Sequence, residues 1–157
     1  MNIFYLHNDV DECSRQHVDK HVVKMIVEYA QLLSCAHRVL DTYVGEECYK
    51  QSHTNHPSAK WVRASHNNYC WLYELWVSLM NEYTYRYGKI HSTARLKDFL
   101  GNPPRNIPIG PFTEPPPAMP EQYKVPGDSI QSYKNYYTNE KRHIAKWKLR
   151  QQPTWFN

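Results

Sequence analysis

Residues 12–40 read ECSRQHVDKHVVKMIVEYAQLLSCAHRVL, and this stretch decides the fold. Its apolar residues recur at steps of three and four positions, which is the spacing of one face of an α-helix. We therefore predict a single long helix from Glu12 to Leu40 with a broad buried face. The residues of that face are Val18, Val22, Met25, Ile26, Tyr29, Leu32, Leu33, Ala36 and Val39.

A second long helix is predicted from about Ser58 to Tyr87, where aromatic and aliphatic residues follow the same spacing. Pro57 suits the first position of this helix, because its missing N–H would have no partner there in any case. Gly88 suits the C-terminal stop, where a left-handed backbone is common.

The remaining chain is predicted to hold shorter elements. The apolar residues 3–6 form either an N-terminal strand or an anchored extended segment. Ser92 is expected to cap a short helix that ends near Leu100, and a last helix is expected over residues 129–150. Nine of the 11 prolines lie within residues 101–128. Proline lacks the N–H that a helix or sheet needs, so this stretch is predicted to be a long Pro-rich crossing of the surface.

These elements predict a mainly α fold, a compact single domain over residues 1–157 with three to four helices. With 41% hydrophobic and 22% charged residues, the chain is expected to fold. Its apolar runs are too short for a transmembrane helix, so no membrane contact is expected. The opening residues lack the basic and apolar regions of a secretory signal, and a cytoplasmic location is therefore expected.

Positive charge is concentrated at the end of the chain. Residues 129–157 hold six basic residues and one acidic residue, a balance of +5, against −1 for the rest of the chain. Tyrosine and tryptophan are interleaved with the basic residues, a pattern typical of elements that contact nucleic acid. The alternative is a solvated amphipathic helix whose aromatic side chains pack into the core. The basic residues are Lys134, Lys141, Arg142, Lys146, Lys148 and Arg150.

A narrow polar stripe runs along the first predicted helix between apolar flanks. Projected at 100° per residue, its members fall on one line. They are His17, His21, Lys24, Glu28, Gln31 and Cys35.

Three interpretations of this stripe remain open. It is a solvent-exposed face with a Lys24–Glu28 ion pair; or His17 and His21 bind a metal together with Glu28; or Glu28 is a catalytic carboxylate oriented by His21 and Lys24. After the first helix, His56 and Arg63 are further candidates for contacts with phosphate.

The order of several motifs resembles that of the pyrimidine-dimer DNA glycosylase family, the small all-α repair enzymes of the phage type. The matching features are Asp19-x-His21 followed by Glu28, the loop Asn55-His56-Pro57, the helix end Tyr85-Arg86-Tyr87-Gly88, and the tail RQQPTWF at residues 150–156. The chain differs from the family at Val27, where the family has an arginine, and at Asn2, where phage members have a small residue.

The resemblance implies a glycosylase and AP lyase that acts on duplex DNA as a monomer and without a cofactor. The α-amine of Met1, or of Asn2 if Met1 is removed, would attack C1′ of the damaged nucleotide and form an imine, assisted by Glu28 and supported by His21. The residues expected to contact DNA are Lys24, His56, Arg63, Lys141, Arg142, Lys146, Lys148, Arg150 and Trp155.

Two alternatives belong to other functional classes. One is a DNA-binding or DNA-base-modifying protein that shares the scaffold but has no lyase activity. The other is a metal-dependent enzyme that uses His17, His21 and Glu28.

Overall fold

The computed structural model describes residues 1–42 and 44–157, and it is mainly α-helical, as predicted. The described residues form six α-helices and three short 3-10 helices, instead of three to four helices. The α-helices are α1 (Val10–Gln16), α2 (Asp19–Leu40), α3 (Pro57–Ala64), α4 (His66–Tyr87), α5 (Lys97–Leu100) and α6 (Ser129–Glu140). The 3-10 helices are Ser92–Leu96, Glu121–Tyr123 and Arg142–Ile144.

The first long helix that we predicted is broken into α1 and α2. Between them, His17 and Val18 have extended backbones, with ψ of 132° and 156°. The carbonyl groups at the C-terminal end of α1 accept hydrogen bonds from a distant part of the chain. The buried guanidinium of Arg86 in α4 donates to Arg15 O and His17 O, both at 2.8 Å. The prediction of one continuous helix was wrong because these partners are about 70 residues away in sequence.

The second long helix is likewise divided, at Ser65. Ser65 is extended, its hydroxyl accepts from Asn68 N at 3.2 Å, and it thereby caps α4. Pro57 begins α3, and Gly88 ends α4 in the left-handed conformation with φ of 67°, both as predicted. The cap of the next short helix is the imidazole of His91 rather than Ser92.

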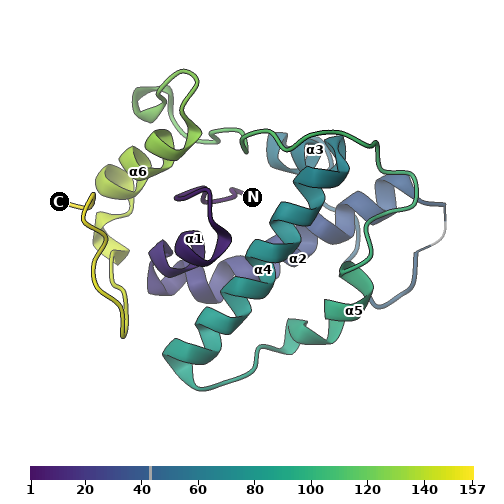
Figure 1. Cartoon of the computed structure of the whole chain (residues 1–157), viewed down its shortest axis with the longest axis horizontal. Helices are drawn as coiled ribbons and strands as arrows, with labels where there is room; N and C mark the ends of the chain where they lie inside the picture. The colour runs from purple at the N-terminus through teal and green to yellow at the C-terminus, as the bar shows by residue number, and fades with distance from the viewer. Residues whose placement is uncertain (43) are drawn as a thin grey trace.

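The core forms where α2 packs on α4, with α1 and α3 against α4 and α2. The segment Ile3–Leu6 is fully buried and extended, without strand pairing. Figure 1 shows its N-terminal end between α6 on one side and α3 and α4 on the other.

The Pro-rich segment runs along one edge of the molecule from α5 past α3 to α6, as Figure 1 shows. It is irregular except for a bridge between Val125 and Asp128 and one 3-10 turn. Hydrogen bonds fix it to the junction of α3 and α4, where Ser65 Oγ donates to Pro111 O at 3.0 Å and His66 N donates to Pro108 O at 2.8 Å. The Pro-rich segment thereby places α6 beside the N-terminal segment (Figure 1).

The last predicted helix is much shorter than expected, because α6 ends at Glu140. Residues 146–148 leave helical geometry to bond the start of α2. Asp19 N donates to Lys146 O at 2.8 Å, and Lys148 N donates to the Asp19 carboxylate at 2.8 Å. Trp147 Nε1 donates to Gln16 O, also at 2.8 Å. Of the six basic residues assigned to a terminal helix, five therefore lie beyond α6, and only Lys134 is in an α-helix.

Among the helices in residues 1–42 and 44–157, none is both long enough and apolar enough to cross a membrane.

Candidate active site

The α-amine of Met1 and the carboxylate of Glu28 lie next to each other. The distance from Met1 N to Glu28 Oε1 is 3.9 Å, close enough for an ion pair but beyond hydrogen-bond reach. The Met1 side chain is packed against the core, and Glu28 is half-buried on α2. Of the residues expected to be catalytic, the structure therefore brings Met1 and Glu28 together.

The second oxygen of this carboxylate is in an unusual state. Glu28 Oε2 is buried, and it has no hydrogen-bond partner among the described residues. Its nearest cation is Lys24 Nζ at 3.6 Å, on a side chain that is 70% exposed. A buried oxygen without a hydrogen bond costs free energy, and the ion pair with Lys24 offsets part of that cost. Glu28 thus has a free acceptor beside an amine.

His56 lies within electrostatic range of the same amine. Its Nδ1 accepts from Ser58 N at 3.0 Å and caps α3, so the ring proton of the neutral imidazole is on Nε2. Burial lowers the pKa of His56, and the positive charges of the Met1 amine and of His53 lower it further. His56 is accordingly a neutral imidazole at neutral pH, held near the α-amine.

His21 is buried beneath the N-terminal segment. Its Nδ1 is 2.7 Å from the hydroxyl of Tyr137, and its ring stacks on Phe4 with centroids 4.1 Å apart. Burial lowers the pKa of His21 to about 3, and the charges of His17, Lys141 and Lys24 act in the same direction. His21 is therefore a neutral imidazole at neutral pH, packed between Phe4 and Tyr137.

The structure does not support the metal-binding interpretation. His17 lies at the α1–α2 junction, and both of its ring nitrogens are occupied, Nδ1 by Cys13 O at 2.7 Å and Nε2 by the Tyr29 hydroxyl at 2.8 Å. Across residues 1–42 and 44–157, no group of three or more His, Cys, Asp or Glu side chains is arranged to hold a metal ion. His17, His21 and Glu28 do not form a ligand set.

Lysines from two parts of the chain gather around the N-terminal half of α2. Lys20 and Lys24 are exposed on the helix itself. Lys141 is near enough to His21 to lower its pKa, and Lys146 is exposed beside the first residue of α2. We call these four residues the lysine rim. Only Lys20 was absent from the residues expected to contact DNA.

Other residues expected to contact DNA have partners within the protein. Arg63 Nη1 donates to Thr54 O at 2.8 Å, in the loop that carries His56. Arg142 donates to Thr138 O and Asn157 O, and its guanidinium lies over Phe156. Lys148 lies over the ring of Tyr87.

Arg150 and Trp155 both help to fix the tail. Arg150 makes two bonds to Glu82, at 2.9 and 3.1 Å, and stacks on Tyr85 with 3.9 Å between guanidinium and ring centroid. Trp155 Nε1 donates to Gln16 Oε1 at 2.9 Å. These contacts stabilise the position of the tail against α1 and α4.

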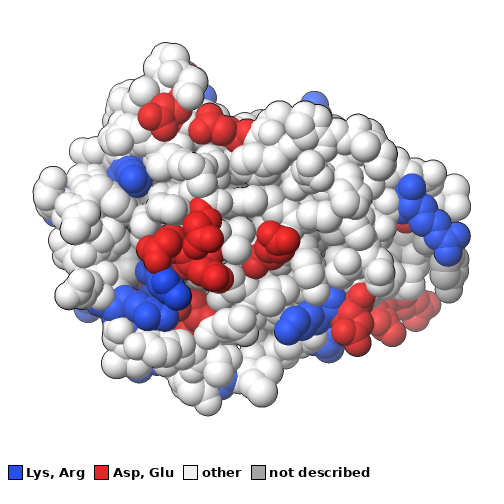
Figure 2. Space-filling model, viewed as in Figure 1, with Lys and Arg blue, Asp and Glu red and all other residues white. Residues whose placement is uncertain are grey.

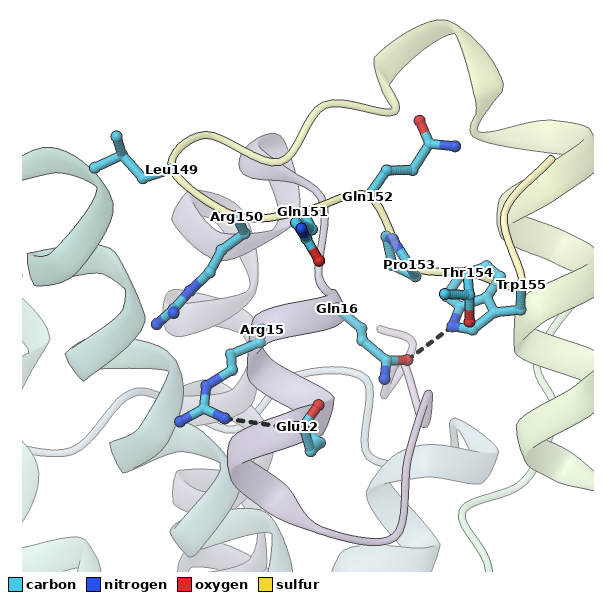
Figure 3. A pocket seen from close by; sticks show the side chains of 10 residues that line it. All are labelled: Glu12, Arg15, Gln16, Leu149, Arg150, Gln151, Gln152, Pro153, Thr154 and Trp155. Carbon is cyan, nitrogen blue, oxygen red and sulfur yellow. Dashed lines mark hydrogen bonds and ion pairs between the residues drawn. The ribbon is translucent and has the colours of Figure 1, made fainter.

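A cavity of about 520 Å³ lies between α1 and this tail. Figure 3 shows the tail arching over α1, with Gln16 reaching from the helix to Trp155. The charged side chains that line the cavity are paired, Arg15 with Glu12 at 2.8 Å and Arg150 with Glu82. The cavity is therefore polar but offers no unpaired charge to a phosphate.

The face of the molecule that includes α1 is acidic at its centre. Figure 2 shows acidic side chains gathered over α1 with basic ones beside them. The acidic residues of α1 and its N-cap are Asp9, Asp11 and Glu12. This face is poorly suited to a phosphate backbone, in contrast to the lysine rim on α2.

Comparisons of the chain with protein-family models, with curated proteins and with solved structures find no match.

Proposed function

We propose that this protein is a DNA glycosylase with AP-lyase activity on damaged or modified pyrimidines in duplex DNA. In this proposal, the Met1 α-amine is the nucleophile and Glu28 is its acid–base partner. The observation that carries the proposal is the 3.9 Å approach of Met1 N to Glu28 Oε1, together with the unpartnered Glu28 Oε2. A neutral amine is a nucleophile that can form a covalent imine with a sugar carbon.

The pair has the groups that both chemical steps need. The neutral amine attacks C1′, the glycosidic bond breaks, and the base departs with its electron pair and takes up a proton. The amine then loses one proton, and the C1′–O4′ bond breaks as O4′ takes up a proton, which opens the sugar ring and leaves a protonated imine between the N-terminus and C1′. Removal of a C2′ proton breaks the C3′–O bond and cleaves the strand. Glu28 can accept the amine proton first and the C2′ proton later, because one of its oxygens has no hydrogen bond to give up.

The lysine rim supplies the means to hold DNA at this site. Two of its members, Lys20 and Lys24, lie on the part of α2 that leads to Glu28, and Lys141 and Lys146 come from the tail; Lys20, Lys24 and Lys146 are exposed. Phosphate contacts of this kind give affinity and fix the position of the duplex without reading its sequence.

One observation favours a second candidate, a DNA-binding or base-modifying protein on the same scaffold without lyase chemistry. The Met1 side chain is only 5% exposed. A residue packed this closely can serve as an anchor of the N-terminal segment. In that case the amine would never reach a sugar.

Borohydride trapping distinguishes the two candidates. Duplexes that contain an abasic site or a pyrimidine dimer are incubated with the protein and the reductant; intact mass spectrometry detects the adduct, and mass spectrometry of its peptides identifies the residue that carries it. We expect a covalent adduct on the N-terminal residue. Salt-sensitive binding without any adduct would establish the second candidate instead.

Glu28→Gln tests the acid–base role, with Glu74→Gln as the matched control because Glu74 is an exposed glutamate on α4. We expect Glu28→Gln to slow strand cleavage by about 100-fold or more while the dissociation constant for DNA stays within about threefold. Equal cleavage rates for the two variants would contradict the mechanism.

A further inference from the structure

The N-terminal segment has to be held in place without secondary structure. Residues 3–6 are buried, and their backbone groups have no strand partner in the described chain. A buried N–H without a partner is costly, so another group must accept from it. Phe4 N donates to the hydroxyl of Tyr29 at 3.1 Å, across 25 residues of sequence. Tyr29 follows Glu28 directly on α2.

The direction of each hydrogen bond around Tyr29 can be assigned. Cys13 O can only accept, so His17 Nδ1 must carry the proton of the ring. His17 Nε2 is then an acceptor, and the Tyr29 hydroxyl donates to it at 2.8 Å. The Tyr29 oxygen therefore donates to His17 and accepts from Phe4. In this buried series of hydrogen bonds, every donor faces an acceptor.

Burial fixes these directions over the neutral pH range. It raises the pKa of Tyr29 well above the ordinary value, so the hydroxyl keeps its proton. It lowers the pKa of His17 to about 4, so the imidazole stays neutral. The charged groups that face His17 are Arg86, which lowers this pKa further, and Glu82, which opposes it.

The side chain of Phe4 is held independently of its backbone. Its ring stacks on His21, with 18° between the ring planes, and His21 is itself bonded to Tyr137. Phe4 is therefore fixed twice to α2, the helix that carries Glu28. From Phe4 the chain has only three residues to the α-amine, a reach of about 10 Å.

We propose that Tyr29, held by His17, is the positioning residue that fixes the Met1 α-amine beside the Glu28 carboxylate. The proposal rests on the proposed function of that pair. Loss of the Tyr29 hydroxyl leaves the buried Phe4 N–H without its acceptor, although Cys13 Sγ still donates to Phe4 O at 3.2 Å, and the amine then moves relative to Glu28. A displacement of about 1 Å at a reacting group is enough to slow a reaction by about 100-fold.

Tyr29→Phe tests the proposal, and Tyr133→Phe is its matched control. Tyr133 is also fully buried near Phe4, and its hydroxyl likewise accepts from one backbone N–H, that of Ala118, and donates to one carbonyl, that of Pro116. Neither bond involves the N-terminal segment. At saturating abasic DNA, we expect the trapping rate to fall at least tenfold in Tyr29→Phe and less than twofold in Tyr133→Phe. DNA affinity should be unchanged in both variants.

A second measurement needs neither DNA nor activity. With [2-¹³C]methionine labelling, the Cα resonance of Met1 reports the carboxylate beside its amine. Glu28→Gln should shift this resonance in the wild-type and Tyr133→Phe backgrounds and should shift it several-fold less in Tyr29→Phe. If wild-type protein forms no imine, the proposed function fails, whereas this spectrum still decides the positioning role.

His17 offers another pair of variants if Tyr29→Phe does not fold. His17→Gln retains an acceptor for the Tyr29 hydroxyl, and His17→Leu does not. We expect the response of the Met1 resonance to Glu28→Gln to persist in His17→Gln and to be lost in His17→Leu. An undiminished response in Tyr29→Phe, or equal responses in the two His17 variants, would overturn the proposal.

Discussion

Arg86 Nε and Glu82 Oε2 are 2.7 Å apart inside the helical core, and both side chains are almost fully buried. Arg86 also bonds Asp19 at 3.0 Å, and Glu82 also bonds Arg150. This four-residue charge network joins α4 to the start of α2 and to the tail. Hydrogen bonds from Arg86 to the free carbonyls of α1 complete it.

Arg86→Met is expected to destabilise the protein by about 3–5 kcal/mol, because it leaves the Glu82 carboxylate buried and two helix-end carbonyls without donors. Urea unfolding followed by circular dichroism measures the loss. The control is Arg15→Met, at an exposed arginine paired with Glu12, where the loss should be below about 1 kcal/mol. Similar losses for both variants would show that the buried network does not stabilise the fold.

Acid should destabilise the protein through His17. Its pKa is about 4 in the folded state and about 6.5 when unfolded, so the unfolded chain binds more protons between these values. The neutral buried ring therefore contributes stability above pH 6.5 that is lost as the pH falls toward 4, on the order of 3 kcal/mol for the full shift. The difference between the free energies of unfolding at pH 7 and pH 4.5 should be smaller in His17→Gln than in the wild type, and part of what remains comes from His21, because burial lowers its pKa to about 3. The exposed His143→Gln should keep the wild-type dependence.

The lysine rim should determine the salt dependence of DNA binding. Each lost phosphate contact lowers the slope of log K against log salt concentration by about 0.9. Lys24→Ala and Lys141→Ala should each weaken binding and reduce this slope, as measured by fluorescence anisotropy between 50 and 200 mM salt, the ~fourfold range over which such effects are large. Lys89→Ala and Lys97→Ala, exposed near α5, should leave the slope unchanged. The reverse pattern would place the DNA on another face.

Gly88→Ala should cost about 1 kcal/mol, because the residue has φ of +67° at the end of α4 and a Cβ disfavours that conformation even in open space. Gly45→Ala is the comparison, since a Cβ there also meets nothing within 4 Å and φ is not positive. Thermal melts of the two variants should therefore differ. Equal melting temperatures would mean that the end of α4 tolerates a side chain.

Helical periodicity predicted the mainly α fold because the apolar faces of α2 and α4 are continuous in sequence. It missed the breaks at His17 and Ser65 for different reasons. The cap of α4 is local, Ser65 to Asn68, and was visible in the sequence. The break at His17 depends on Arg86 and Trp147, which are distant in sequence and have no local signal.

The same distinction applies to the candidate site. Glu28 and Lys24 share a helix face, so spacing alone pairs them. The approach of Met1 to Glu28 depends on how Phe4 is anchored, which no spacing rule describes. The tail differs most from the helix predicted for residues 129–150, because Lys146 and Lys148 form hydrogen bonds with Asp19 in place of helical ones.

The bonds from Lys146, Trp147 and Lys148 to the α1–α2 junction have a consequence for biosynthesis. On the ribosome, the N-terminal half emerges long before these residues are translated, and the junction then lacks three of its partners. The junction between α1 and α2 therefore cannot acquire its full set of hydrogen bonds until the last segment has been synthesised. Premature termination near residue 145 would release a chain in which Asp19 and Gln16 lack these partners.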